Sequence, residues 1–328
     1  MNDWSNIQGH EQIKNDLRQL LAEKRLPHAL LFTGIEGIGK NLTAKVLAKV
    51  LFCSGEKEKS CNNCPSCRAF DAKNHPDFYC LEPEGKANNI KIEQIRQMQS
   101  QIALSPYLAD KRVVIINDAE TMNEAAENSL LKTLEEPTGD VVFILVTANK
   151  DLLLPTILSR CMKLYFAPLS EDEIKIILKS KYAVNEDKAT VIAKLSGGSM
   201  KRAISFLDDD NFNLCQNAMD FLSKDLNAKD IWQISDEFSA MDKAKIKQWA
   251  DFLQMIIRDL LLLRAGADDN LLYNRDKKDV LDKLIVNFSL NRLFNCQNLI
   301  ENLVKRLSSN ADLKLMMQDF MLSWREQK

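Results

Sequence analysis

Apolar residues in the first half of the chain follow two different spacings. They recur every three or four positions, as in amphipathic helices, over residues 10–24, 41–52, 92–102 and 123–134. Between these segments lie short apolar runs that predict strands, at 29–33, 78–81, 113–116, 141–146 and 162–166. Strands that alternate with helices are typical of an α/β fold, in which a parallel sheet is covered by helices on both sides.

Beyond residue 168 the strand-like runs stop and only helical spacing remains. The helices predicted there cover residues 171–181, 187–195, 200–207, 231–238, 245–263, 278–288, 290–307 and 312–324. A chain of 328 residues is also longer than the roughly 250–300 residues at which a single core stops growing. We therefore predict three domains: an α/β domain at 1–167, a small helical domain at 168–209 and an all-helical domain at 210–328.

Composition and charge narrow the class of protein. Hydrophobic residues make up 45% and charged residues 27% of the chain, as in soluble globular proteins. The net charge of −2 gives no overall basic surface for nucleic acid, so any DNA contact must be local or shared with a partner. No apolar run approaches the ~18 residues of a membrane span, and the first residues lack a signal-peptide pattern. These features predict a cytoplasmic protein without a membrane partner.

A glycine-rich loop lies between the first predicted strand and the helix that follows it. The segment 34–40 reads Gly-Ile-Glu-Gly-Ile-Gly-Lys, with its glycines at Gly34, Gly37 and Gly39. In this context the backbone N–H groups can wrap a polyphosphate, Lys40 can reach its β- and γ-phosphates, and the helix N-terminus adds a positive end. A tight turn without a ligand is the alternative. The context favours a site for ATP or ADP.

The residues that would hold magnesium depart from the usual pattern. Asn41 stands where a Ser or Thr hydroxyl normally ligates Mg²⁺. The run 113–116 resembles a Walker B strand, but Asn117 comes first after it and an amide lacks the charge of a carboxylate. Unless Asp118 substitutes, two magnesium groups are lost together, which argues against Mg²⁺ binding. Alternatively, Asp118 and Glu120 only begin a solvated helix.

Four of the eight cysteines fall within fifteen residues, at Cys53, Cys61, Cys64 and Cys67. A reducing compartment argues against disulfides, and four thiolates suffice for a closed, structural zinc (Zn²⁺) site. Zinc would also fold a segment that cannot build a core of its own. The alternatives are an iron–sulfur cluster or four free thiols. His75 is a substitute ligand if one cysteine is not used, or otherwise a turn histidine.

The remaining cysteines are isolated in the sequence. Free cysteines of this kind are usually buried. We therefore expect burial for Cys80, Cys161, Cys215 and Cys296.

Three further segments carry a resemblance to a known family. They read Asn-Ser-Leu-Leu-Lys-Thr-Leu-Glu-Glu-Pro at 128–137, Phe-Ile-Leu-Val-Thr at 143–147 and Leu-Pro-Thr-Ile-Leu-Ser-Arg-Cys at 154–161. These motifs resemble the clamp-loader subunits of bacterial DNA polymerase III. The resemblance covers residues 4–207 by motif, whereas the rest matches in length and helical character. It implies an AAA+ P-loop domain, a helical lid at 168–209 and a C-terminal collar that joins subunits into a ring.

The resemblance also implies roles for single residues. Arg160, in Ser-Arg-Cys, matches the arginine finger that reaches into a neighbouring subunit's ATP site. Thr147 falls at the sensor-1 position, and Lys201 at the sensor-2 position, where motor subunits of the family usually place arginine. A lysine keeps the positive charge but loses the two-pronged geometry of a guanidinium. A similar cysteine spacing at the same place occurs in the delta-prime and gamma/tau subunits of the family, which supports zinc.

These features support two hypotheses for the function of the chain, and a third is less well supported. A delta-prime-like subunit would sit at one end of a hetero-pentameric ring of gamma/tau- and delta-type subunits, donate Arg160 to its neighbour and help load the sliding clamp onto primer–template DNA. Its own ATPase site would be weak or inactive, as Asn41 and Asn117 suggest. An active gamma/tau-type ATPase is the second hypothesis. Another AAA+ replication or recombination ATPase is the third, but it leaves the cysteines and the Ser-Arg-Cys motif unexplained.

Overall fold

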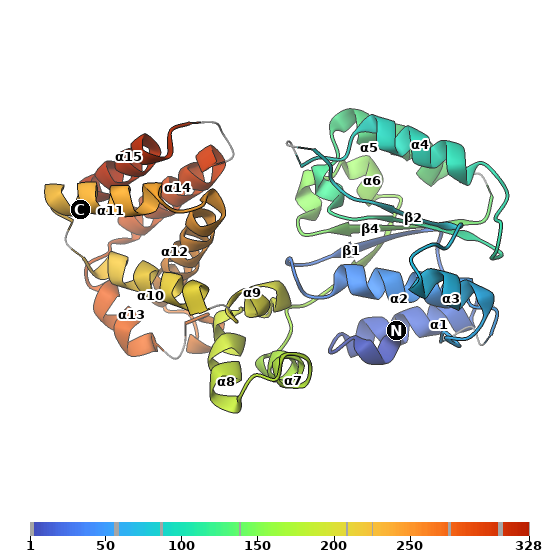
Figure 1. Ribbon diagram of the computed structural model, residues 1–328, viewed down its shortest axis with the longest axis horizontal. Helices are drawn as coiled ribbons and strands as arrows, with labels where there is room; N and C mark the ends of the chain where they lie inside the picture. The colour runs from blue at the N-terminus through green and yellow to red at the C-terminus, as the bar shows by residue number, and fades with distance from the viewer. Residues whose placement is uncertain are drawn as a thin grey trace. The chain divides into compact units, whose positions relative to one another are not determined.

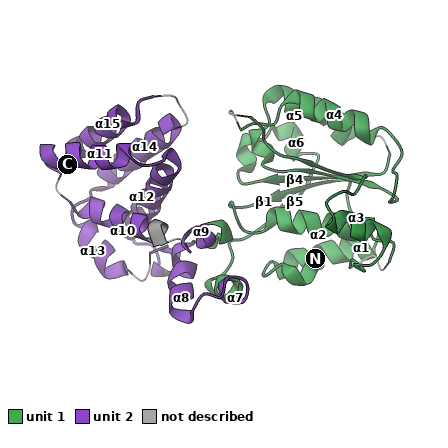
Figure 2. Cartoon of the chain, viewed as in Figure 1, with its two compact units in different colours: residues 1–177, 198–201 green, residues 178–197, 202–328 purple. Residues whose placement is uncertain are grey.

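The computed structural model describes residues 3–55, 59–85, 88–137, 139–207, 209–224, 226–274, 277–307 and 311–327. The chain forms two compact units (Figure 2). The first unit comprises residues 1–177 and 198–201, and the second comprises residues 178–197 and 202–328. The domain boundaries predicted at residues 167 and 209 stay a prediction.

The first unit is built on a parallel sheet whose strands lie in the order β2-β3-β4-β1-β5. Every residue of β1, β3 and β4 is buried, whereas the edge strands β2 and β5 are partly exposed. The predicted strands are therefore confirmed, with bounds that shift by at most one residue. They are β1 (Ala29–Thr33), β2 (Phe78–Leu81), β3 (Arg112–Ile116), β4 (Val141–Thr147) and β5 (Met162–Tyr165).

Helices cover both faces of this sheet (Figure 1). Because side chains alternate along a strand, Leu30 and Phe32 of β1 enter the core beneath α1–α3, while Ala29 and Leu31 enter the core beneath α4–α6. The α-helices are α1 (Glu11–Ala22), α2 (Lys40–Phe52), α3 (Pro65–Asp71), α4 (Ile92–Ile102), α5 (Glu124–Glu135), α6 (Pro155–Leu158) and α7 (Glu171–Tyr182), of which α7 runs on into the second unit. Short 3-10 helices are η1 (Trp4–Asn6), η2 (Ala119–Thr121) and η3 (Lys150–Leu152). The predicted α/β fold class, a parallel sheet covered by helices and followed by an all-helical region, is confirmed.

The second unit is all-helical in its described residues. Its core is aromatic: the fully buried Trp249 contacts the rings of Phe221, Phe238 and Phe320. No helix among the described residues is apolar over enough length to cross a bilayer. The elements that complete the chain are α8 (Glu186–Leu195), α9 (Met200–Ser205, which starts in the first unit), α10 (Asp209–Ser223), α11 (Ala228–Ser239), α12 (Lys243–Arg264), η4 (Asp269–Leu271), α13 (Lys278–Ile285), α14 (Leu290–Leu307) and α15 (Leu313–Glu326).

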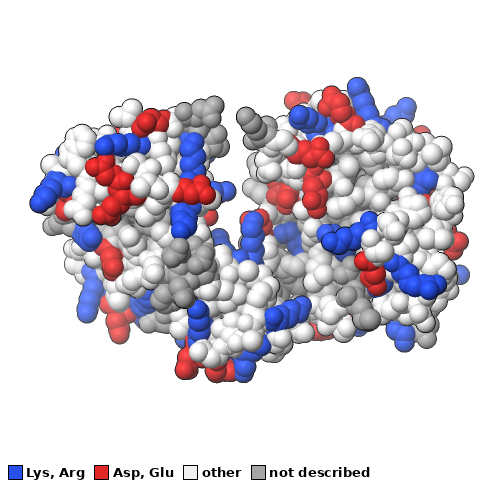
Figure 3. Space-filling view, in the orientation of Figure 1, with Lys and Arg blue, Asp and Glu red and all other residues white. Residues whose placement is uncertain are grey.

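Surface charge is mixed within each unit. On the face drawn in Figure 3, basic and acidic side chains are interspersed in both. This pattern agrees with the net charge of −2. On this face, therefore, neither unit presents the continuous basic surface typical of a protein that binds DNA alone.

A buried carboxylate fixes the loop that connects α4 to β3. Asp77 is fully buried, and its oxygens accept the backbone N–H groups of Tyr107, Leu108 and Ala109 at 2.7, 2.8 and 3.0 Å. The guanidinium of Arg112 lies 3.6 Å from the same carboxylate. Burial raises the pKa of Asp77, but the three N–H donors outweigh it and the pKa is lowered overall.

Replacing this carboxylate should destabilise the protein. We expect Asp77→Asn to lower the free energy of unfolding by about 2–4 kcal/mol, because it removes the charge opposite Arg112 and misplaces an acceptor. Urea denaturation of the full chain measures the effect, and exposed Asp110→Asn is the control, expected within about 0.5 kcal/mol of wild type. A lowered folded-state pKa stabilises above the ordinary value of about 4, so the difference should shrink as the pH falls below it. A difference independent of pH between 7 and 3 contradicts this role.

Candidate functional site

The glycine-rich loop joins β1 to α2 in a left-handed backbone conformation. Gly34, Gly37 and Gly39 have φ angles of 150°, 80° and 99°. A Cβ atom on Gly34 would lie 2.3 Å from the carbonyl oxygen of Phe166, and one on Gly37 would lie 2.4 Å from Cβ of Lys201, so packing requires both glycines. Around Gly39 such an atom would meet nothing within 4 Å. The loop therefore has free space at the N-terminus of α2, where a phosphate can approach the backbone.

Lys40, the first residue of α2, bonds its own loop. Its Nζ donates to the carbonyl oxygens of Gly34 and Ile35 at 2.5 and 2.7 Å. Burial lowers the pKa of Lys40, although nearby carboxylates, led by Glu120, oppose the shift. A phosphate that binds here would exchange the two carbonyl contacts for charge-assisted bonds.

Three carboxylates surround the predicted phosphate site. Asp118 follows β3 with a left-handed φ of 48°, and burial, reinforced by Glu120 and Glu36, raises its pKa. Glu120 accepts the backbone N–H of Ala148 through Oε1 at 2.8 Å, while its Oε2 is buried without a hydrogen-bond partner. The sequence pattern allows Glu120 to be either an acid at the end of a Walker B-like strand or part of a solvated helix start. The structure instead makes it a link between the end of β3 and the end of β4.

Of the two amides at the predicted magnesium positions, Asn41 lies on α2 and Asn117 directly follows β3. The Oδ1 atom of Asn41 is buried without a hydrogen-bond partner. Asn117 donates from Nδ2 to Oδ2 of Asp118 at 3.4 Å, a long contact. An amide oxygen can ligate a hard cation but carries no charge, so neither position supplies the hydroxyl or carboxylate that usually holds Mg²⁺. The residues present therefore fit magnesium poorly.

Thr147 and Lys201 reach the same edge of the sheet from different elements. Thr147 ends β4, is fully buried and pairs in register with Thr33 of β1; its Oγ1 accepts the N–H of Asn149 at 3.1 Å. Lys201 forms an exposed ion pair with Glu36 of the glycine loop. The roles of Thr147 and Lys201 as sensors stay predictions.

Backbone contacts hold the segment before α9 against the glycine loop. The Oγ of Ser199 donates to the carbonyl oxygen of Glu36 at 2.8 Å, and the N–H of Met200 donates to that of Gly37 at 2.9 Å. Residues separated by more than 160 positions thus meet at one site. Lys201 owes its place beside the loop to these contacts.

His10 contacts the glycine loop in a way that the sequence does not predict. It precedes α1 with a left-handed φ of 56°, and its Nε2 lies 2.8 Å from the carbonyl oxygen of Ile38. Its ring meets Phe166 edge-on at 4.9 Å. His10 therefore supports the loop from outside, and no local pattern links it to a segment 28 residues away.

Arg160 lies just beyond α6 and is held by its own chain. Its guanidinium pairs with Glu135 at the end of α5 and donates to the carbonyl oxygen of Thr156 at 2.7 Å. Helix α6 is itself fixed to α5, because the buried carboxylate of Glu127 accepts the N–H of Leu154 at 2.8 Å. None of these partners belongs to the glycine loop. A rigid support thus carries a partly exposed guanidinium.

The four predicted metal ligands come together. The Sγ atoms of Cys53, Cys61, Cys64 and Cys67 all lie within 4.8 Å of one another, compatible with the ~3.8 Å edges of a tetrahedron whose Zn–S bonds are about 2.3 Å. Backbone N–H groups bond the sulfurs; that of Cys64, for example, lies 3.3 Å from Cys61 Sγ. Burial raises the pKa of Cys53 and of Cys67, whereas at Cys64 hydrogen-bond donors outweigh burial and bring the pKa to about 6. This donor set fits a thiolate-bound metal ion.

The other predicted ligand takes no part in this cluster. His75 is buried, stacks on Phe52 at 3.9 Å and accepts the N–H of Asp77 at Nδ1, as a turn histidine does. Cys161, Cys215 and Cys296 are buried as predicted. For Cys80 the prediction of burial is wrong: it lies on the edge strand β2 and is only half-buried.

Comparisons with known proteins identify the family. The family model "DNA polymerase III, delta subunit" matches residues 9–170, and "DNA polymerase III, delta subunit, C terminal" matches residues 212–326. DNA polymerase III subunit delta' of Bacillus subtilis is 30% identical over 318 residues, which cover 93% of each chain. The chain belongs to the delta' family of DNA polymerase III subunits. The delta' subunit of Escherichia coli is 29% identical over 259 residues, 78% of this chain and 77% of that protein.

The tau subunit matches a smaller part of the chain. DNA polymerase III subunit tau of Bacillus subtilis is 31% identical over 211 residues, 62% of this chain but 37% of that protein. The match to delta' proteins extends through the helical second unit. The predicted membership of a delta-prime-type family is therefore confirmed.

The cysteine cluster makes a direct prediction. We expect the full chain to bind close to one zinc ion and Cys67→Ser to lose it, because a tetrahedral site needs all four thiolates. Metal analysis after gel filtration measures the ratio, and Cys80→Ser is the control for loss of a thiol outside the cluster. Acid should release the ion, since the ligands must stay deprotonated. Equal metal in Cys67→Ser and Cys80→Ser contradicts the assignment.

Proposed function

We propose that this chain is a delta-prime-like subunit of a hetero-pentameric clamp loader with gamma/tau- and delta-type subunits. In this ring Arg160 enters the ATP site of an adjacent motor subunit, and the assembly loads the sliding clamp onto primer–template DNA. The observation that carries the proposal is a guanidinium on a rigid support whose present contacts are all exchangeable. Family membership supports the setting.

The contacts of Arg160 are weak enough to be exchanged. The side chains of Arg160 and Glu135 are 31% and 48% exposed, and ion pairs with such exposure are worth about 0–1 kcal/mol. A γ-phosphate offers two oxygens to the planar guanidinium and gains charge in the transition state. Transfer from Glu135 to a neighbour's phosphate therefore costs little. The buried Glu127 keeps α6 fixed during this exchange.

The nucleotide site of this chain supports binding more than turnover. Amides at positions 41 and 117 replace groups that usually hold Mg²⁺, and Lys40 is engaged by its own loop. A subunit that only supplies a finger does not need to hydrolyse ATP itself. If ATP or ADP binds at this site, its proposed role is therefore structural.

The cysteine cluster is assigned a structural zinc ion. Four thiolates leave no open position for a water molecule or a substrate, so the ion has no catalytic part. It would instead fix the segment between α2 and α3. When bound, zinc supplies only the four bonds that close this segment.

Removing the finger should slow the assembled ring. In a complex reconstituted with motor and delta-type subunits, we expect Arg160→Ala to slow hydrolysis at the neighbouring site at least about 100-fold, since arginine fingers contribute 10³–10⁵ in GTPases. A rapid-quench experiment measures the ATP hydrolysed per complex in the initial burst. Loss of the neighbouring site appears as a smaller burst. Arg160→Lys should recover only part of it, because it keeps the charge but not the fork.

The matched control for this experiment is Arg96→Ala, which removes an exposed arginine on α4. It should leave the burst unchanged. Gel filtration of each complex shows that all subunits are present. An intact burst in a complete Arg160→Ala complex contradicts the proposed finger.

A gamma/tau-type ATPase is the second candidate. One observation favours it: the space at Gly39 is open to a phosphate. We expect the purified chain, with ATP and magnesium, to show no turnover above that of Lys40→Ala. A fluorescent ATP analogue tests binding separately. Turnover by wild type that Lys40→Ala abolishes contradicts the passive site and favours the motor.

A further inference from the structure

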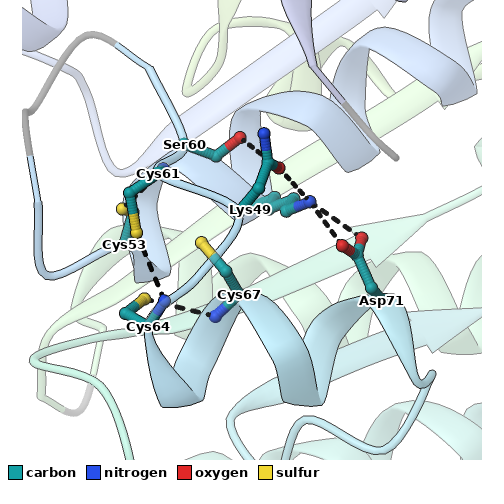
Figure 4. A network of polar contacts seen from close by, with 8 residues as sticks. Lys49, Cys53, Ser60, Cys61, Cys64, Cys67 and Asp71 are labelled. Atoms are coloured by element: carbon teal, nitrogen blue, oxygen red, sulfur yellow. Dashed lines mark hydrogen bonds and ion pairs between the residues drawn. The ribbon is translucent and has the colours of Figure 1, made fainter.

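Lys49 is a fully buried charged side chain next to the cysteine cluster. It lies on α2, and its side chain is 0% exposed. Its Nζ donates to Oδ1 of Asn62 at 2.6 Å and to Oδ1 and Oδ2 of Asp71 at 2.8 and 2.7 Å (Figure 4). Lysines are almost never fully buried unless paired. Neither the phosphate loop nor the arginine finger uses this group.

The partners of Lys49 come from every part of the cysteine module. Lys49 precedes Cys53 by four residues on the helix that leads into it, and Asp71 ends α3, the helix that carries Cys67. Asn62 lies between Cys61 and Cys64 in the connecting turn. One ammonium group therefore joins α2, the turn and α3, the three segments that supply the four sulfurs.

A direct route connects Lys49 to a sulfur. Asn62 adopts a left-handed φ of 60°, a conformation that asparagine tolerates better than most residues, and it directly follows Cys61 in the turn. The Oδ1 of Asn62 also accepts the hydroxyl of Ser60 at 3.2 Å. By holding the Asn62 side chain, Lys49 fixes the turn between Cys61 and Cys64, in which the N–H of Cys64 bonds Sγ of Cys61 at 3.3 Å.

We propose that Lys49 is a positioning residue of the metal centre: through Asn62 and Asp71 it holds the four sulfurs in ligating geometry and fastens them to the phosphate-loop helix. Residues that orient metal ligands typically change metal affinity 10- to 100-fold when they are removed. The positive charge also suits its surroundings, because a divalent ion with four thiolates carries a net charge of −2. The inference rests on the proposed metal centre but not on the arginine finger.

The test measures metal affinity in the full chain. Lys49→Met removes the donors and keeps an apolar side chain of similar length, and we expect it to weaken zinc binding 10- to 100-fold in competition with a chromogenic chelator. Cobalt titration adds a second readout, because thiolate coordination gives Co²⁺ characteristic absorption bands that distorted ligation alters. Lys45→Met, on the same helix, is the control and should bind as wild type does.

A second variant keeps the proposal testable if Lys49→Met does not fold. Asn62→Gly retains the left-handed backbone but removes the amide that Lys49 holds, and we expect a similar loss of affinity. Asn63→Gly, in the same turn, controls for added flexibility. Wild-type affinity in Lys49→Met or in Asn62→Gly overturns the role of Lys49. A wild-type chain that binds no metal instead overturns the metal centre itself.

Discussion

Complete burial of β1, β3 and β4 on both faces of the sheet is the constraint on which the rest of the first unit depends. Parallel strands buried in this way need helices on each side. Because the strands all run in the same direction, the loops that leave their carboxyl ends lie along one edge of the sheet. The glycine loop follows β1, Asp118 follows β3, and Thr147 ends β4. The topology of the sheet therefore places these residues together at the carboxyl ends of the strands.

Helix α5 connects the sheet to Arg160, the proposed arginine finger. Its apolar face enters the core beneath the sheet, with Leu130 and Leu134 fully or almost fully buried. Glu127 and Glu135 lie on the same helix and hold the start of α6 and the guanidinium of Arg160. A buried acid thus holds the start of α6, whereas an exposed acid pairs with the guanidinium that we propose to move. The difference in burial matches the difference in proposed role.

The sequence was sufficient for features with a local signal. Apolar runs predicted all five strands, and the spacing of the cysteines predicted the cluster at Cys53–Cys67. Helix α3 was missed because its seven residues carry too little apolar repeat; its start depends instead on Cys64, which caps it, and on Pro65. Helix α10 is likewise not predicted from the sequence.

Long-range polar contacts could not be predicted in the same way. His10 on Ile38, Glu135 on Arg160 and Lys49 on Asp71 each join segments 22 to 28 residues apart. Such pairs depend on how helices pack over the sheet, and no periodicity encodes them. A buried lysine such as Lys49 reads in the sequence as an ordinary surface residue of a helix.

In the proposed ring, the guanidinium of Arg160 leaves Glu135 to act in another subunit. An electron cryo-microscopy structure of the reconstituted complex with a non-hydrolysable ATP analogue would show this exchange. We expect density that joins Arg160 to the γ-phosphate at the adjacent motor subunit, with Glu135 released. Arg160 still paired with Glu135 in a closed, nucleotide-filled ring would contradict it.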